Sequence, residues 1–111
     1  MKLSQARKYA LSLPETNEEP HFDYSSFRVR GKIFATVPPS GEFLHIFVDE
    51  VQRAPLIAAQ PDVYAALHWG VKVVGVKVTL ATASAVTVDR LLRQSWLRKA
   101  PKRLAESLQR E

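Results

Sequence analysis

Two arginines and a lysine surround a glycine in the segment FRVRGKIFATV, residues 27–37. Arg28, Arg30 and Lys32 have the spacing of cations at the tip of a β-hairpin, where side chains can contact phosphate oxygens without reading base edges. The alternative is that they form the solvated face of an ordinary antiparallel sheet. The sequence predicts a basic hairpin and leaves both roles open.

The net positive charge of the chain is confined to its last part. The formal charge at pH 7 is +5, and residues 90–111 carry all of it, because the basic and acidic side chains of residues 1–89 cancel. This segment could extend a phosphate-binding surface if it lies beside the hairpin; the cations concerned are Arg93, Lys99, Lys102 and Arg103. Cations near a helix C-terminus also complement the helix dipole, which would leave them solvated instead.

Other polar side chains do not combine into a catalytic or metal-binding pattern. His21, His45 and His68 lie at no metal-ligand spacing from one another or from a carboxylate pair. The sequence contains no cysteine, no glycine-rich phosphate loop and no nucleophile motif. We therefore predict a protein that is not an enzyme and that uses no metal or cofactor.

A second candidate site lies on the predicted open face of the sheet. Phe34 and His45 alternate with apolar neighbours along two predicted strands, and His68 and Trp69 flank a predicted turn. These four side chains could line a pocket for a small ligand or a protein segment. Alternatively, Trp69 closes the edge of the hydrophobic core.

Hydrophobic periodicity and turn residues predict the elements that position these side chains. Helices are expected to follow N-caps at Ser4, Asp49 and Thr87. Residues 14–23 are polar and are predicted to form a loop, with at most a short edge strand near His21. Strands are predicted at residues 27–30, 33–37, 43–48, 62–67 and 71–80.

Several details of these elements are also predicted. Pro55 should kink the second helix or divide it in two, and Gly75 should mark a bulge or a close approach between main chains. Residues 102–111 are expected to add a further turn or to form a frayed basic tail. Alternation places Val74, Val76 and Val78 on one face of the last strand, and helical periodicity predicts a buried stripe of Val88, Leu91, Leu92, Ser95 and Trp96.

The resulting order, α-β-β-β-α-β-β-α, predicts an α+β fold in one domain over residues 1–111. In this two-layer sandwich, helices cover one face of an antiparallel sheet. No apolar run approaches the roughly 20 residues that span a bilayer, and Arg7 and Lys8 interrupt the apolar stretch near the N-terminus. We expect a cytoplasmic protein that does not bind membranes.

Four segments resemble, in this order, the MmcQ/YjbR family of small bacterial proteins: ALSLPETNEEPHF, SFRVRGKIFATV, HIFVDEVQRAPLIAAQPDVY and WLRKAPKRL. The similarity extends over roughly residues 3–104. It implies a two-layer α+β fold related to secretion chaperones, often called CyaY-like, which agrees with the predicted element order. It also implies DNA binding by a double wing, in which β-hairpins and adjacent helices grip the duplex.

We therefore predict a non-enzymatic DNA-binding protein that grips the phosphate backbone. The basic hairpin with Arg28, Arg30 and Lys32 and the C-terminal helix would supply the contacts. The alternative prediction is a module that binds a protein or a small ligand on the open sheet face near Trp69.

Overall fold

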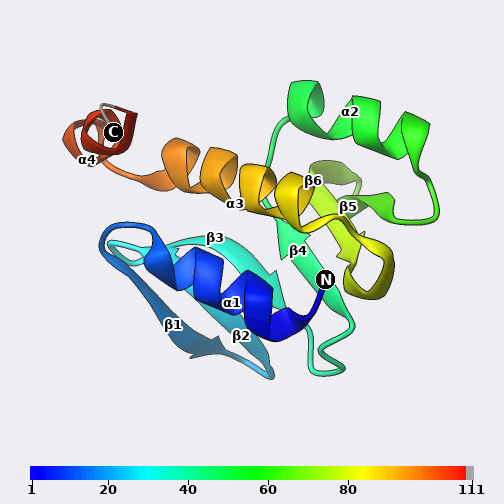
Figure 1. Cartoon of the computed structure of the whole chain (residues 1–111), viewed down its shortest axis with the longest axis horizontal. Coiled ribbons are helices and arrows are strands. Elements are labelled where there is room, and N and C mark those ends of the chain that lie inside the picture. Colours follow the sequence, from blue (N-terminus) through cyan, green and yellow to red (C-terminus); the bar gives the residue numbers. More distant parts are fainter. Residues whose placement is uncertain (110–111) are drawn as a thin grey trace.

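The computed structural model of this chain describes residues 1–109 and shows helices packed on a curved, open antiparallel sheet (Figure 1). The helices are α1 (Leu3–Ser12), α2 (Glu50–Ala59), α3 (Ala85–Lys99) and α4 (Lys102–Gln109), with a short 3-10 turn, η1, at Leu80–Thr82. The strands are β1 (Thr16–His21), β2 (Tyr24–Val29), β3 (Lys32–Val37), β4 (Phe43–Ile46), β5 (Tyr64–Trp69) and β6 (Lys72–Thr79). They are arranged in the order β1-β2-β3-β4-β6-β5. The predicted α+β fold is confirmed.

The first strand, β1, replaces most of the loop predicted at residues 14–23. It pairs with β2 along its whole length, from Thr16 opposite Val29 to His21 opposite Tyr24. Its side chains are exposed or half-buried, so it lacks the apolar alternation that indicates a strand. The edge strand allowed near His21 is confirmed, but the loop predicted before it was wrong, because main-chain pairing at a sheet edge needs no apolar side chains.

A charge pair links edge strand β1 to helix α1. Glu18 accepts hydrogen bonds from Arg7 of α1, the shortest of them 2.9 Å long, and from Ser25 of β2 at 2.6 Å. Burial raises the pKa of Glu18, but these hydrogen bonds outweigh it, so that the pKa lies below its usual value.

The hydrophobic core lies between the sheet and helices α1 and α3. All five residues of the predicted α3 stripe are buried, which confirms that prediction. The Trp96 indole donates hydrogen bonds of 3.1 Å to the Pro14 carbonyl and to the Thr16 hydroxyl. Ser95 donates a 2.6 Å hydrogen bond to the Phe34 carbonyl. Helix α3 is therefore fixed both to the α1–β1 connection and to β3.

The predicted helix starts were only partly right. Asp49 caps α2 as predicted, since its carboxylate accepts a hydrogen bond from the Gln52 main chain. The other two helices begin earlier than predicted: the N-cap of α1 is Lys2 and not Ser4, and the N-cap of α3 is Ser84 and not Thr87.

A bulge in β3 turns Phe34 into the core. Phe27 pairs with Ala35 and Arg28 pairs with Ile33, so Phe34 is an extra residue with no partner of its own on β2. Phe34 is fully buried and packs near Phe27, with 6.5 Å between ring centroids. Its predicted place in a pocket on the open face is therefore wrong, because the bulge interrupts the strict alternation on which that prediction depended.

A second bulge lies in β6 and moves Val74 off the core face. Leu67 pairs with Gly75 and His68 with Val73, which leaves Val74 as the extra residue. Val76 and Val78 are fully buried, whereas Val74 is only half-buried. The close approach predicted at Gly75 is confirmed, because a Cβ there would collide with the Ile46 carbonyl oxygen.

Helix α2 runs uninterrupted through Pro55, so of the two predicted effects, a kink or a division, the division is wrong. The missing amide of Pro55 would have bonded the Val51 carbonyl, and Val51 lies on an exposed part of the helix, where water can satisfy that oxygen.

Residues 102–109, expected as a further turn or a frayed tail, form α4, and its Leu108 is buried. Residues 110 and 111 of the predicted tail lie outside the described part of the chain. Among residues 1–109, no helix is both long and apolar enough to cross a membrane.

Candidate binding groove on the open face of the sheet

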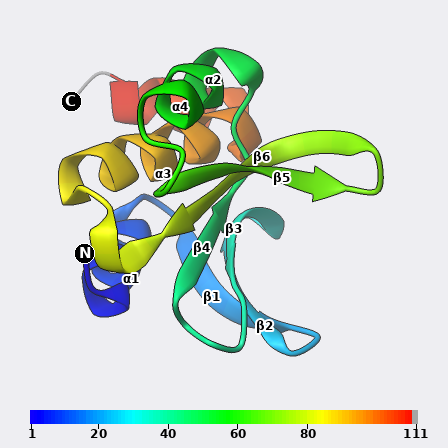
Figure 2. The same ribbon diagram turned by 90° about the vertical axis from the view of Figure 1, so that its right-hand side faces the viewer.

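A groove of about 940 Å³ lies between two β-hairpins. One wall is the β1–β2 turn, and the other is the β5–β6 hairpin together with the C-terminal end of α3. Figure 2 shows that both hairpins extend to the same side, away from the helices. The floor comes from β3 and β4, through side chains such as Thr36 and His45.

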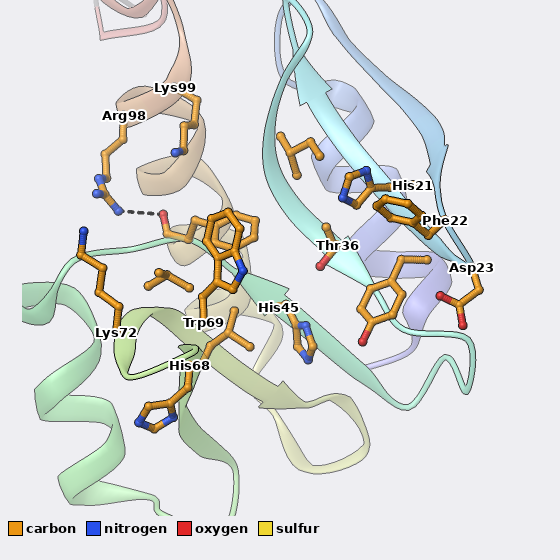
Figure 3. Close-up of a pocket in the computed structure, with 15 residues that line it drawn as sticks. His21, Phe22, Asp23, Thr36, His45, His68, Trp69, Lys72, Arg98 and Lys99 are labelled. Atoms are coloured by element: carbon orange, nitrogen blue, oxygen red, sulfur yellow. Dashed lines mark hydrogen bonds between the residues drawn. The ribbon is translucent and has the colours of Figure 1, made fainter.

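The two walls carry exposed aromatic side chains. Phe22 lies in the β1–β2 turn with 92% of its surface exposed, and Trp69 at the end of β5 with 81%. Figure 3 shows Trp69 on one side of the groove and His21 and Phe22 on the other, with Thr36 and His45 between them. Rings of this size supply flat apolar surface at the rim.

Cations gather on the Trp69 side of the groove. Lys72, Arg98 and Lys99 line this side, whereas Asp23, on the opposite side, is the one carboxylate among the described lining residues (Figure 3). Lys72 is the cross-strand partner of Trp69, so a cation and an indole lie directly opposite each other at the end of the hairpin.

The chain leaving β4 holds the two α3 cations in place. Arg98 donates a 2.9 Å hydrogen bond to the Phe47 carbonyl, and the Lys99 ammonium lies 5.9 Å from the centroid of the Phe47 ring. Both contacts are compatible with further interactions, because each cation keeps donors that these contacts do not use. The residue after β4 therefore organises one positive end of the groove.

His45 forms part of the groove floor in a half-buried position. It pairs with Thr36 of β3 and with Lys77 of β6, and the Tyr24 ring centroid lies 6.0 Å from that of His45. Burial, together with the charge of Lys77, lowers the pKa of His45. Its imidazole is therefore neutral at pH 7 and can donate one hydrogen bond and accept another.

The structure distributes the predicted pocket residues between two places. His45, His68 and Trp69 line the groove, while Phe34 belongs to the core. Trp69 does not close the core edge, because most of its surface is exposed.

The cations of the predicted basic hairpin are largely engaged within the protein. Arg30 forms a two-pronged ion pair with Glu15, with a shortest distance of 2.7 Å. Arg28 donates to the Ser26 hydroxyl at 2.9 Å and to the Pro20 carbonyl at 3.4 Å. Lys32 is exposed at the start of β3. The turn between them is the predicted tight one, with φ of 48° at Arg30 and 81° at Gly31.

The four C-terminal cations are also separated. Lys99 lines the groove, and Lys102 and Arg103 are exposed in the first turn of α4. Arg93 is half-buried near Tyr9 of α1. Burial and the charge of Asp89 raise the pKa of the Tyr9 phenol, and the charge of Arg93 offsets part of this rise. Of the seven cations predicted to bind nucleic acid, Lys99 is the one that lines the groove.

Sequence reasoning missed Phe22, Lys72 and Arg98. Phe22 fell in a segment predicted to be a loop, and nothing local distinguishes Lys72 from a solvated strand residue. The Phe-Asp pair between two polar runs is a sequence signal that could have indicated a hairpin tip. Within residues 1–109, no group of three or more potential ligand side chains could hold a metal ion.

Comparison with known proteins identifies a matching family and a similar solved structure. A family model described as YjbR matches residues 11–98. The crystal structure of Deinococcus radiodurans protein DR2400, with the family-model domain DUF419, is similar with a TM-score of 0.74 and 24% identity. The alignment covers 87% of this chain and 77% of that chain, and at this identity it shows a shared fold. No curated protein matches the chain.

Proposed function

This chain belongs to the YjbR family, and on that premise we propose that it is a DNA-binding module whose site is the groove between the two hairpins. The observation that carries the proposal is the grouping of Lys72, Arg98 and Lys99 along one wall, with a single carboxylate, Asp23, among the described lining residues. Phosphates bind where cations converge and carboxylates are scarce. The exposed rings at the rim add surface that nucleotides can contact.

The proposed site differs from the basic hairpin that the sequence indicated. Arg30 is already paired with the Glu15 carboxylate, and Arg28 uses its Nε and Nη2 on internal acceptors, so both have fewer donors left for phosphate. Lys72 and Lys99 have no hydrogen-bonding partner among the described residues and can contact phosphate directly. Lys32, Lys102 and Arg103 are exposed and could contribute only long-range attraction from outside the groove.

We propose binding without catalysis. Apart from the bond from Arg98 to a main-chain carbonyl, the described lining side chains form no hydrogen bond with one another that would join a nucleophile to a base. The cysteine-free sequence suits the reducing cytoplasm, where DNA would be available to a bacterial protein.

The test is fluorescence anisotropy of labelled 20-nucleotide DNA, titrated with the protein at 50 and 200 mM salt. Three phosphate contacts predict a slope of about −2 to −2.7 in log K against log salt. The Lys72→Ala/Lys99→Ala variant should bind more weakly and with a shallower slope. Lys8→Ala removes an exposed cation from α1, outside the groove, and should change little.

Two outcomes would contradict the proposal. One is the absence of binding at 50 mM salt to either single-stranded or duplex DNA. The other is a loss of slope and affinity per removed cation that is the same in the groove variant, which lacks two cations, as in Lys8→Ala, which lacks one, because binding would then follow total charge and not this site.

A protein segment or a small ligand is the second candidate occupant. The groove volume of about 940 Å³ falls within the range of roughly 300–1,000 Å³ typical of small-molecule pockets. Half-buried His45 and Tyr24 could orient a polar group on the ligand. If DNA does not bind, a thermal-shift screen of anionic aromatic metabolites and acidic peptides would test this candidate.

A further inference from the structure

We propose that the groove binds single-stranded nucleic acid in preference to duplex, with bases stacked on Trp69 and Phe22 and phosphates held by Lys72, Arg98 and Lys99. This inference rests on the proposed function and specifies the form of its ligand.

The first argument is the exposure of the two rings. Among the described large aromatic side chains, Phe22 and Trp69 are the ones that lie mostly in solvent, whereas Phe27, Phe34, Tyr64 and Trp96 are almost fully buried. A single exposed apolar residue is unremarkable on a protein surface. Here, however, the two rings line one groove, and flat rings at a site are the platforms on which unpaired bases stack.

The second argument is that the position of Phe22 is conformationally costly. Its φ is 58°, in the left-handed region that glycine and asparagine occupy readily and that bulky side chains avoid. The core does not require a phenylalanine there, since 92% of the residue's surface is exposed. Its ring contacts that of His21, with 4.9 Å between the centroids, and His21 also lines the groove. Such strain at an exposed aromatic residue is typical of a binding position.

The third argument is the register of the β5–β6 hairpin. Trp69 and Lys72 are cross-strand partners, and Arg98 and Lys99 line the same side of the groove (Figure 3). A base on the indole would therefore have its own or the neighbouring phosphate beside these cations. Single-strand sites combine aromatic platforms with a positively charged groove in this way.

Duplex DNA would use only half of these features. Its phosphates could contact the three cations, but the faces of its bases are already stacked within the helix and only their edges are accessible. Stacking on Trp69 and Phe22 requires bases that are unpaired and splayed from the strand. The exposed rings would then contribute nothing specific to duplex binding.

The experiment compares a labelled 20-nucleotide single strand of mixed sequence with its duplex, at 50 mM salt. Wild-type protein should bind the single strand at least about tenfold more tightly, because each stacked base adds affinity. Trp69→Ala should weaken single-strand binding by about tenfold or more and duplex binding much less. Val71→Ala is the matched control, because Val71 is fully exposed in the same hairpin turn but does not line the groove.

Tryptophan fluorescence provides a second measurement. Trp96 is buried, so stacking should quench mainly the emission of Trp69. We expect the single strand to quench wild-type emission and to leave the emission of Trp69→Ala unchanged.

The possible results separate this inference from the proposed function. Equal or tighter binding of the duplex, or single-strand binding that is insensitive to Trp69→Ala, would overturn the inference and leave DNA binding at the groove intact. Failure to bind either form would overturn both and leave a protein or small ligand as the occupant.

Discussion

Arg30 forms a two-pronged ion pair with Glu15, with its Nε 2.7 Å from Oε1 and its Nη2 3.2 Å from Oε2. The pair joins the β2–β3 turn to the segment before β1, and it lowers the pKa of Glu15 through the hydrogen bond from Arg30. The charge of Arg30, in the predicted basic hairpin, is thus already paired with the Glu15 carboxylate. The functional consequence is that the basic hairpin is a weak candidate for gripping phosphate.

We therefore predict that Arg28→Ala/Arg30→Ala/Lys32→Ala has a smaller effect on DNA affinity than Lys72→Ala/Lys99→Ala, although it removes one more cation. Screened charges outside a site contribute only weak long-range attraction. Anisotropy titrations at 50 mM salt measure both variants. A larger loss in the hairpin variant would return the site to the β2–β3 turn.

Phe22→Gly should stabilise the protein and weaken its ligand binding at the same time. Removing a left-handed phenylalanine relieves a strain of about 1 kcal/mol, although the greater freedom of glycine in the unfolded chain offsets part of this gain. Urea unfolding reports the stability, and single-strand titration reports the affinity. A clear loss of stability would show that the ring has a structural role that its exposure does not reveal.

Gly75→Ala should destabilise the protein by about 3 kcal/mol, because overpacking against a rigid neighbour is among the costlier core changes. The added Cβ would collide with the Ile46 carbonyl oxygen and lie 3.0 Å from the Phe47 Cα. Gly31→Ala is the control for backbone strain alone, since Gly31 has φ of 81° and open space around it. Chemical denaturation compares the two, and a loss at Gly75 of less than about 1 kcal/mol would show that the neighbouring main chain makes room for the added Cβ.

His45 should make stability depend on pH between neutral and mildly acidic conditions. Because burial and Lys77 lower its pKa in the folded protein, the unfolded chain binds a proton that the folded protein rejects. The stability contribution is intact above the ordinary pKa of about 6.5 and is lost as pH falls through the lowered folded value.

His45→Gln should flatten this dependence. Urea midpoints measured at pH 7.5 and 5.5 would show a smaller decrease for the variant than for wild type. An unchanged decrease would assign the pH dependence to groups other than His45.

The helices and the central strands were predictable because burial imposes a period on their residues. The α3 stripe, the Asp49 cap and the close approach at Gly75 all follow from local rules. Strand β1 did not follow, because an edge strand with Pro20 and three charged or amide side chains has no dry face. Its pairing depends on β2, which lies elsewhere in the sequence.

The groove was predictable only in part. His45, His68 and Trp69 were candidates because of their residue types, and they do line it. The alternation of apolar and polar residues could not show that Phe34, unlike these three, faces the core. A bulge is a feature of two paired strands and leaves no clear trace in the sequence of either one alone. Arg98 and Lys72 come from α3 and β6, and only the tertiary fold brings them together.

The contact of the Trp96 indole with Pro14 and Thr16 has a consequence for how the chain folds as it is synthesised. The first four strands end at Ile46, so the ribosome has made them well before the helix that covers them. At about 5–20 residues per second, the roughly fifty residues up to Trp96 take several seconds to emerge. Throughout that interval the apolar face of the nascent sheet has no α3 to bury it. The connection between α1 and β1 gains its hydrogen bonds from Trp96 only after α3 has left the exit tunnel.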